Sequence, residues 1–342
     1  MNILVTGGAG YIGGTFAYEA LKNNHNVLAL DNFSNSKPEQ IKKLKSIFNK
    51  NFSFHEIDLS IQSNELSECL KEFKPDVVVH FAGLKAVGES QSNPIKYWDN
   101  NVVSSINLLK AMAENCIKKL IFSSSATVYG DSKLQPIPET ADIKSMSVYG
   151  STKIVIEKMF SEAASIGKID VVSLRYFNPV GAHKEKIIFE NPFDFPNNLM
   201  PRIIRVALGI DEKLEIYGDD YETKDGSGER DYIHILDLIN GHFSAINYIL
   251  EHNGESVFNL GTGTSTSVFE LIKTFESVNS LKIPYKISKR RAGGIDQELS
   301  QDVFSFIRGI KKEVQKSLVD DLNALIESNK REGQEVEKIS TG

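Results

Sequence analysis

The sequence predicts an α/β fold in which a doubly wound parallel sheet carries a smaller C-terminal lobe. Two observations support this prediction. Short apolar runs alternate with longer stretches of helical patterning along the first half of the chain, as in repeated βαβ units. A glycine cluster also follows the first apolar run directly, at the point where a strand would turn into a helix. Crossovers between parallel strands are right-handed, which leaves few possible topologies.

The first element is a buried strand at residues 2–6 (NILVT), because a short apolar run suits the interior of a parallel sheet. The glycines that follow lead into a helix that ends near Asn24. Further apolar runs predict strands at 27–30, 77–81, 120–123, 171–174 and 257–260.

Composition indicates a globular protein without a nucleic-acid or membrane partner. The 342 residues are 41% hydrophobic and 25% charged, and the net charge of -6 would repel a polyanion. Two cysteines, Cys69 and Cys116, are too few for a disulfide framework and favour the reducing cytoplasm. No apolar run reaches the roughly 18 residues of a membrane span, and the first residues do not resemble a signal peptide. The seven histidines form no metal-ligand cluster, so we expect no metal.

Gly7, Gly10 and Gly13 have the spacing of a dinucleotide-binding loop. Gly7 permits a tight turn, Gly10 lets the backbone approach a pyrophosphate, and Gly13 lets the helix pack closely on the sheet. The helix N-terminus then offers free N–H groups and a positive dipole to phosphates. A glycine triplet alone is also consistent with a simple loop, but its position between strand and helix favours a Rossmann-type sheet.

Asp31 ends the second predicted strand, the position from which a carboxylate bonds the adenosine ribose hydroxyls. Its charge would repel a 2′-phosphate, so Asp31 favours NAD over NADP. A turn or helix-cap role is the alternative interpretation, because Asn32 follows it.

The sequence pattern changes after Asn178, where several X-Pro pairs indicate a loop-rich stretch. We expect an NAD-binding domain at 1–177, with return segments around 232–262. The substrate lobe would comprise 178–231 and 263–330, including a polar helix at 315–330. Residues 331–342 are predicted to form a flexible tail.

Tyr149 and Lys153 are four residues apart, so on a helix their side chains share one face. An ammonium beside a phenol favours the phenolate, which makes tyrosine a usable base near neutral pH. The same spacing also arises by chance in many helices. Ser125 makes this pair more specific, because it follows a predicted strand and its hydroxyl would face the crevice where such sheets bind ligands.

The glycine loop, Ser125, Tyr149 and Lys153 together resemble the extended short-chain dehydrogenase/reductase family. Longer segments resemble, within it, the UDP-glucose 4-epimerase family. These segments are 80–90 (HFAGLKAVGES), 123–131 (SSSATVYGD), 175–183 (RYFNPVGAH), 197–201 (NNLMP) and 228–234 (GERDYIH). The resemblance covers the chain almost continuously from Met1 to about Gly263.

The resemblance implies an isomerase that interconverts UDP-glucose and UDP-galactose, with bound NAD and without a metal. Tyr149 would take the 4-hydroxyl proton while C4 delivers hydride to the nicotinamide. Lys153 would bond the nicotinamide ribose and lower the pKa of the tyrosine, and Ser125, helped by Thr127, would hydrogen-bond the reacting oxygen. The resulting 4-keto sugar would turn over in the pocket and take the hydride back on its other face.

Two further sets of residues follow from the resemblance. The cofactor set comprises Gly7, Gly10, Tyr11, Ile12, Gly13, Asp31, Asn32, Asn35, Ser36, Asp58, Leu59, Phe81, Ala82, Gly83, Lys85, Asn100, Ser123, Tyr149, Lys153, Tyr176 and Phe177. The substrate set comprises Lys85, Ser125, Ala126, Thr127, Tyr149, Asn178, Asn198, Leu199, Tyr217, Arg230 and Arg291. Arg230 and Arg291 would meet the diphosphate, because arginine forks suit phosphate oxygens. Lys85 and Asn100 are also consistent with solvated side chains.

The resemblance weakens after Arg291. The family commonly continues R-R-x-G-D, and its aspartate grips the nucleotide ribose, whereas this chain continues Ala292-Gly293-Gly294. Asp296 would replace that aspartate only if the loop shifts. The wall beside the sugar lies in this region, so the sequence leaves the choice between a hexose and an N-acetylhexosamine open.

Two other functions remain alternatives. The chain would be a 4-epimerase of another UDP-sugar, an N-acetylhexosamine or a uronate, or a non-catalytic NAD-binding sensor or interaction protein. Intact Ser125, Tyr149 and Lys153 argue against a sensor, which needs no proton-transfer group. Related dehydratases carry a carboxylate beside the serine position, which this chain lacks. The family also implies a homodimer, and the apolar stripes at 102–112 and 154–160 would face the second subunit or the core.

Overall fold

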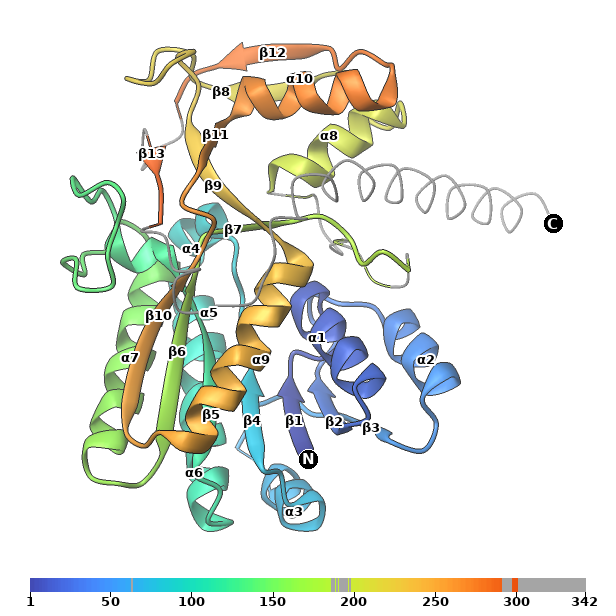
Figure 1. Cartoon of the computed structure of the whole chain (residues 1–342), viewed down its shortest axis with the longest axis vertical. Helices are drawn as coiled ribbons and strands as arrows, with labels where there is room; N and C mark the ends of the chain where they lie inside the picture. Colours follow the sequence, from blue (N-terminus) through green and yellow to red (C-terminus); the bar gives the residue numbers. More distant parts are fainter. Residues whose placement is uncertain are drawn as a thin grey trace.

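The computed structural model describes residues 1–62, 64–185, 188, 190, 196, 198–290 and 297–300. Its main body is a seven-stranded sheet with the order β10-β6-β5-β4-β1-β2-β3, in which every neighbouring pair is parallel (Figure 1). Helices cover both faces, so the predicted fold class is confirmed. The strands are β1 (Asn2–Thr6), β2 (Asn26–Asp31), β3 (Phe52–Glu56), β4 (Val77–His80), β5 (Lys119–Ser125), β6 (Asp170–Tyr176) and β10 (Glu255–Leu260).

Alternate residues of the strands separate two cores. In β1, Ile3 and Val5 join the core on one face of the sheet and Leu4 joins the core on the other. The first face is covered by α1 (Tyr11–Lys22), α2 (Pro38–Ile47) and α9 (Ile235–Glu251). The second face is covered by α3 (Asn64–Phe73), α6 (Ser104–Glu114) and α7 (Val148–Ser165).

The strand order changes direction between β1 and β4, which is where open parallel sheets bind ligands beyond their carboxyl ends. Short helical segments gather at this edge of the sheet. They are α4 (Val87–Ser92), α5 (Pro94–Tyr97), the π-helix η1 (Trp98–Val103) and the 3₁₀-helix η2 (Ala126–Tyr129).

A smaller lobe lies beyond this edge (Figure 1). Its elements are β7 (Asn178–Val180), α8 (Leu199–Ala207), β8 (Leu214–Tyr217), β9 (Glu229–His234), β11 (Ser265–Ser267), α10 (Val268–Asn279), β12 (Tyr285–Ser288) and β13 (Gln297–Glu298). β9 pairs with β7, β11 and β13, and β8 pairs with β12. Ile203, Ile216 and Phe275 belong to the apolar core of the lobe. The chain returns to the large sheet in α9 and β10.

The apolar stripes at 102–112 and 154–160 contribute mainly to the core. Leu108, Met112, Ile156 and Phe160 are at most 1% exposed, whereas Val155 is 42% exposed. The helix and tail predicted at 315–330 and 331–342 lie outside the described residues. Among the described helices, none has both the length and the apolar character of a membrane span.

Candidate active site

One cavity of about 960 Å³ runs from the glycine loop, past the carboxyl ends of β4, β5 and β6, to α8 and β8 in the lobe. It is lined by every predicted site residue except two. Ala126 is buried instead in a cluster with Val128 and Tyr129 and is not among the residues that line the cavity. Arg291 lies outside the described residues. Cofactor and substrate residues therefore share one continuous space.

The glycine loop has a shape that larger residues would disrupt. Gly7 has φ +68°, and a Cβ there would lie 2.9 Å from the backbone nitrogen of Ala82. A Cβ on Gly13 would lie 2.3 Å from the carbonyl oxygen of Gly7. The backbone at the start of α1 is thereby open to the cavity, which suits a pyrophosphate at the helix N-terminus.

Asp31 joins the glycine loop to the loop after β2. Its Oδ2 accepts a hydrogen bond from the backbone N–H of Ala9 at 3.0 Å. Its Oδ1 accepts from the N–H of Phe33 at 2.9 Å and from the hydroxyl of Ser36 at 2.8 Å. The turn role considered for Asp31 is therefore present, and the carboxylate also lines the cavity, where ribose hydroxyls would reach it.

Ser125, Tyr149 and Lys153 converge where the cofactor part of the cavity meets the lobe. Tyr149 lies in the first turn of α7 and Lys153 one turn later, and both side chains line the cavity. The Ser125 hydroxyl accepts a hydrogen bond from the Thr127 hydroxyl at 2.9 Å. Lys153 Nζ lies 5.8 Å from the centroid of the Tyr149 ring and donates to the carbonyl oxygen of Ser123 at 2.7 Å.

The pKa of Tyr149 differs from the prediction. Burial raises the pKa of the Tyr149 phenol to about 12, although the Ser125 hydroxyl acts in the opposite direction. Burial also lowers the pKa of Lys153 to about 8, opposed by the charge of Glu157. The expected lowering of the tyrosine pKa by the ammonium is therefore absent from this structure. Desolvation is the largest cause of the raised pKa of Tyr149, and Lys153 Nζ donates its hydrogen bond to the Ser123 carbonyl.

A buried ion pair behind the catalytic helix was not predicted. Arg175 in β6 binds Glu157 in α7 through two hydrogen bonds of 3.0 and 2.7 Å. Glu157 also accepts a hydrogen bond from Ser124, which lines the cavity together with Ser123 and Ser125. The pair thus fixes α7 against β5 and β6. A charged residue in a buried strand such as 170–176 was the available sequence signal.

A second buried network involves Asn101, the neighbour of the predicted Asn100. Asn101 Oδ1 accepts from the N–H of Leu84 at 2.7 Å, and Nδ2 donates to the Leu84 carbonyl at 3.0 Å and to the Thr152 hydroxyl at 3.1 Å. Asn100 lines the cavity, whereas Asn101 ties the loop after β4 to α7. Asn100 and Asn101 therefore have different roles, and the sequence did not reveal this difference.

Glu190 connects two predicted substrate residues across the cavity. Its Oε1 accepts hydrogen bonds from Lys85 Nζ at 2.7 Å and from Asn198 Nδ2 at 2.6 Å. Asn178, a third predicted substrate residue, donates to the backbone carbonyl of Asp231 at 3.1 Å. Glu190 was not predicted, because a single acidic residue in a loop usually reads as a solvated side chain.

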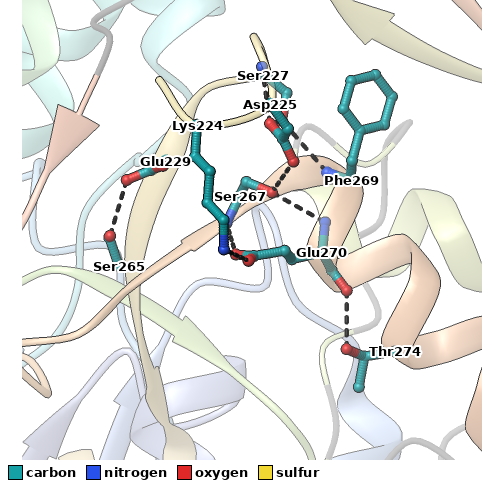
Figure 2. A network of polar contacts seen from close by, with 9 residues as sticks. All are labelled: Lys224, Asp225, Ser227, Glu229, Ser265, Ser267, Phe269, Glu270 and Thr274. Atoms are coloured by element: carbon teal, nitrogen blue, oxygen red, sulfur yellow. Dashed lines mark hydrogen bonds and ion pairs between the residues drawn. The ribbon is translucent and has the colours of Figure 1, made fainter. Parts of the chain in front are cut away.

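The cavity wall that includes Gly228 and Arg230 is held by polar contacts at the start of α10 (Figure 2). Asp225 accepts hydrogen bonds from the backbone and hydroxyl of Ser227 at 3.0 and 2.7 Å. It also accepts one from the hydroxyl of Ser267, the N-cap residue of α10. These contacts fix the loop that leads into β9, and Arg230 in β9 lines the cavity.

Comparisons with known proteins show the family of this chain. Residues 3–261 match the model of the NAD dependent epimerase/dehydratase family. The chain is 44% identical over 296 residues to UDP-glucose 4-epimerase of Bacillus subtilis, which covers 86% of this chain and 87% of the relative.

Solved structures give the same result. The fold resembles UDP-glucose-4-epimerase from Stenotrophomonas maltophila, solved with bound NAD and formylated UDP-arabinopyranose, with a TM-score of 0.91 and 38% identity, covering 98% of this chain and 99% of that one. It also resembles the enzyme from Bifidobacterium longum in complex with NAD+ and UDP, with a TM-score of 0.85 and 39% identity, covering 95% and 96% of the two chains. The resemblance expected from the sequence is confirmed, and the chain belongs to the NAD dependent epimerase/dehydratase family.

Proposed function

We propose that this protein inverts C4 of a UDP-hexose, interconverting UDP-glucose and UDP-galactose through a transient 4-keto sugar. The observation that carries the proposal is the convergence of Ser125, Tyr149 and Lys153 at the centre of one cavity. Its relatives of this name, and structural neighbours with NAD and a UDP compound, support the same reaction.

The residues around the glycine loop fit NAD. The tight approach at Gly7 and Gly13 leaves room for a pyrophosphate, and the Asp31 carboxylate disfavours a 2′-phosphate. When bound, NAD supplies a hydride acceptor that returns the hydride within the same cycle. Lys153 would bond the nicotinamide ribose, and the remaining predicted cofactor residues would line the cleft.

The reaction requires proton transfer at the sugar 4-oxygen. Tyr149 would take the 4-hydroxyl proton as the carbonyl forms and give it back after the sugar has turned over. Ser125 and Thr127 would hydrogen-bond the same oxygen, and the burial of Ser125 and Tyr149 would keep water away from the keto sugar. Lys85, Asn178, Asn198 and Arg230 would hold the diphosphate and sugar.

The test is interconversion of UDP-glucose and UDP-galactose by purified protein without added NAD. Tyr149→Phe is expected to lower turnover by about 10²- to 10⁴-fold, because it removes only the proton-transfer group, and NAD should stay bound. Tyr285→Phe is the matched control, since this tyrosine lies 47% exposed on β12, and should turn over normally.

Three outcomes separate the candidate functions. Interconversion of the two hexoses supports the proposal. Turnover restricted to UDP-N-acetylglucosamine or a UDP-uronate would indicate a 4-epimerase of another sugar. Bound NAD without turnover of any of these substrates would indicate a non-catalytic NAD-binding protein.

We further propose a cytoplasmic homodimer. Ile95, Trp98 and Val155 are 80%, 37% and 42% exposed on the neighbouring elements α5, η1 and α7. Such a group of exposed apolar side chains favours a protein interface. Cys69 and Cys116 are free thiols, which is typical of a reducing compartment.

A further inference from the structure

Strand β13 leads into two residues that contact both the lobe and the large domain. β13 pairs with β9 beside Arg230 and runs from the lobe towards the large sheet (Figure 1). The chain continues into Leu299 and Ser300, which hydrogen-bond to the loop after η2 and to β9, respectively. We call Leu299 and Ser300 the clasp.

On the lobe side, the clasp is held by the carboxylate of Asp231 in β9. Oδ2 of Asp231 accepts from the N–H and the hydroxyl of Ser300 at 3.1 and 2.5 Å, and from the N–H of Gly263 at 3.0 Å. Oδ1 accepts from the N–H and the hydroxyl of Thr262, both at 2.7 Å. Asp231 is fully buried, and a buried carboxylate is costly unless such donors solvate it. These neutral donors are therefore fixed around one charge.

On the side of the large domain, the clasp binds the loop after η2. The N–H of Ile137 donates to the carbonyl oxygen of Leu299 at 2.8 Å, and the N–H of Leu299 donates to Gln135 Oε1 at 3.1 Å. The carbonyl oxygen of Ile137 accepts from Asn259 Nδ2 at 2.9 Å, and Asn259 Oδ1 accepts from the Tyr129 hydroxyl at 2.6 Å. The clasp is thus connected to the last residue of η2 through buried hydrogen bonds.

Both ends of this connection lie next to residues that line the cavity. Asp231 follows Arg230 in β9, and its backbone carbonyl accepts from Asn178 Nδ2 at 3.1 Å. Tyr129 lies two residues after Thr127 in η2. Arg230, Asn178 and Thr127 all line the cavity, the first two from the lobe and the third from the large domain.

We propose that Asp231 and Ser300 are positioning residues that set the separation between the lobe wall and the proton-transfer residues of the large domain. This inference rests on the proposed function. A UDP-hexose would contact Arg230 and Tyr149 at the same time, so a shift of the lobe by about 1 Å would move the sugar 4-oxygen out of reach of the phenol. UDP alone would still bind the lobe, and NAD would still bind the large domain.

The first test is Ser300→Ala, which removes the hydroxyl that binds Asp231 and keeps the backbone N–H. We expect kcat with UDP-galactose to fall by about 10- to 10²-fold, the size of effect that a misplaced substrate produces. Calorimetric affinity for UDP and the amount of bound NAD should stay at the wild-type values. A variant that was merely less stable would not lower kcat while retaining both ligands.

Asp231→Asn tests the other partner of the same contact. In either orientation, the amide NH2 would face a backbone N–H, that of Thr262 or those of Gly263 and Ser300. Turnover should fall at least as far as in Ser300→Ala. The double variant should lose no more than Asp231→Asn alone, because both changes break one contact. Should thermal unfolding show that Asp231→Asn does not fold, Ser300→Ala decides the question.

Ser265→Ala is the matched control. The Ser265 hydroxyl in β11 donates to Glu229 in β9 at 2.8 Å, so this bond also joins a serine to a carboxylate of β9, but within the lobe (Figure 2). Turnover, UDP affinity and bound NAD should all stay at the wild-type values.

The outcomes separate this inference from the proposed function. A wild-type protein that does not interconvert the two UDP-hexoses would overturn the proposed function, and this inference with it. Wild-type turnover that is unchanged in Ser300→Ala would overturn the role of the clasp alone. A loss of turnover in Ser300→Ala that is matched by a loss of UDP affinity or of bound NAD would also overturn it, since the hydroxyl would then support binding and not position.

Discussion

Tyr149 and Lys153 are buried together, and their ionisation should control the pH dependence of turnover. Burial raises the pKa of Tyr149 to about 12 and lowers that of Lys153 to about 8. The reactive form needs Tyr149 as a phenolate and Lys153 as an ammonium, and in this form the two groups together hold one titratable proton. The alternative form, a phenol beside a neutral amine, holds the same number of protons. Below about pH 8 the pair holds two protons, so turnover requires the loss of one. We expect kcat to rise as the pH increases through about 8.

Initial rates with UDP-galactose across the neutral and alkaline range provide the measurement. Lys153→Met removes the first group to titrate, so the rise in kcat should move towards the higher pKa of Tyr149. A wild-type profile that is flat on both sides of pH 8 would contradict this account.

At the scale of elements, the ion pair between Glu157 and Arg175 should be the main polar link between α7 and β6. The two side chains are 6% and 4% exposed. Glu157→Gln leaves a buried guanidinium without its counter-charge, and we expect it to lower the free energy of unfolding by about 3–5 kcal/mol. Lys158→Ala removes one partner of an exposed pair with Glu162 on the same helix, and should cost less than about 1 kcal/mol. Denaturant unfolding measures both, and equal effects would exclude a special role for the buried pair.

The elements also show how far the sequence could predict this molecule. β1 was predicted with its full bounds because four of its five residues are buried in the centre of a parallel sheet. β3 was missed because it lies at the edge of the sheet and buries only Phe52. The strands of the lobe are short and part-exposed, and their pairing joins distant segments, which no local pattern predicts.

Some site residues could likewise be predicted from local sequence patterns, and others could not. Gly7, Asp31 and Tyr149 follow local rules of spacing, and all three line the cavity. Glu190 and Glu215 also line the cavity, but they face it only because the lobe folds over the sheet. From the sequence alone, each would be predicted to be a solvent-exposed side chain. The raised pKa of Tyr149 likewise depends on burial, which the spacing of Tyr149 and Lys153 does not reveal.

At the scale of the whole molecule, we expect two chains to associate through α5, η1 and α7. Light scattering should give twice the mass of one chain. Val155→Glu places a charge among the exposed apolar residues of this surface and should shift the protein to monomers. Ile210→Glu charges a more exposed apolar residue in the lobe and should leave the mass unchanged. A monomeric wild-type protein would exclude the homodimer.

The three hydrogen bonds that Asp31 accepts from its own chain also restrict how this protein can evolve. Replacing Asp31 by a small neutral residue would remove the charge that repels a phosphorylated adenosine ribose, but it would also release the N–H of Ala9 from its partner. The glycine loop, which we propose cradles the pyrophosphate, would lose rigidity in the same step. A change of preference from NAD to NADP would therefore require a second substitution that anchors the loop again. Coenzyme preference and the order of the glycine loop are coupled through Asp31.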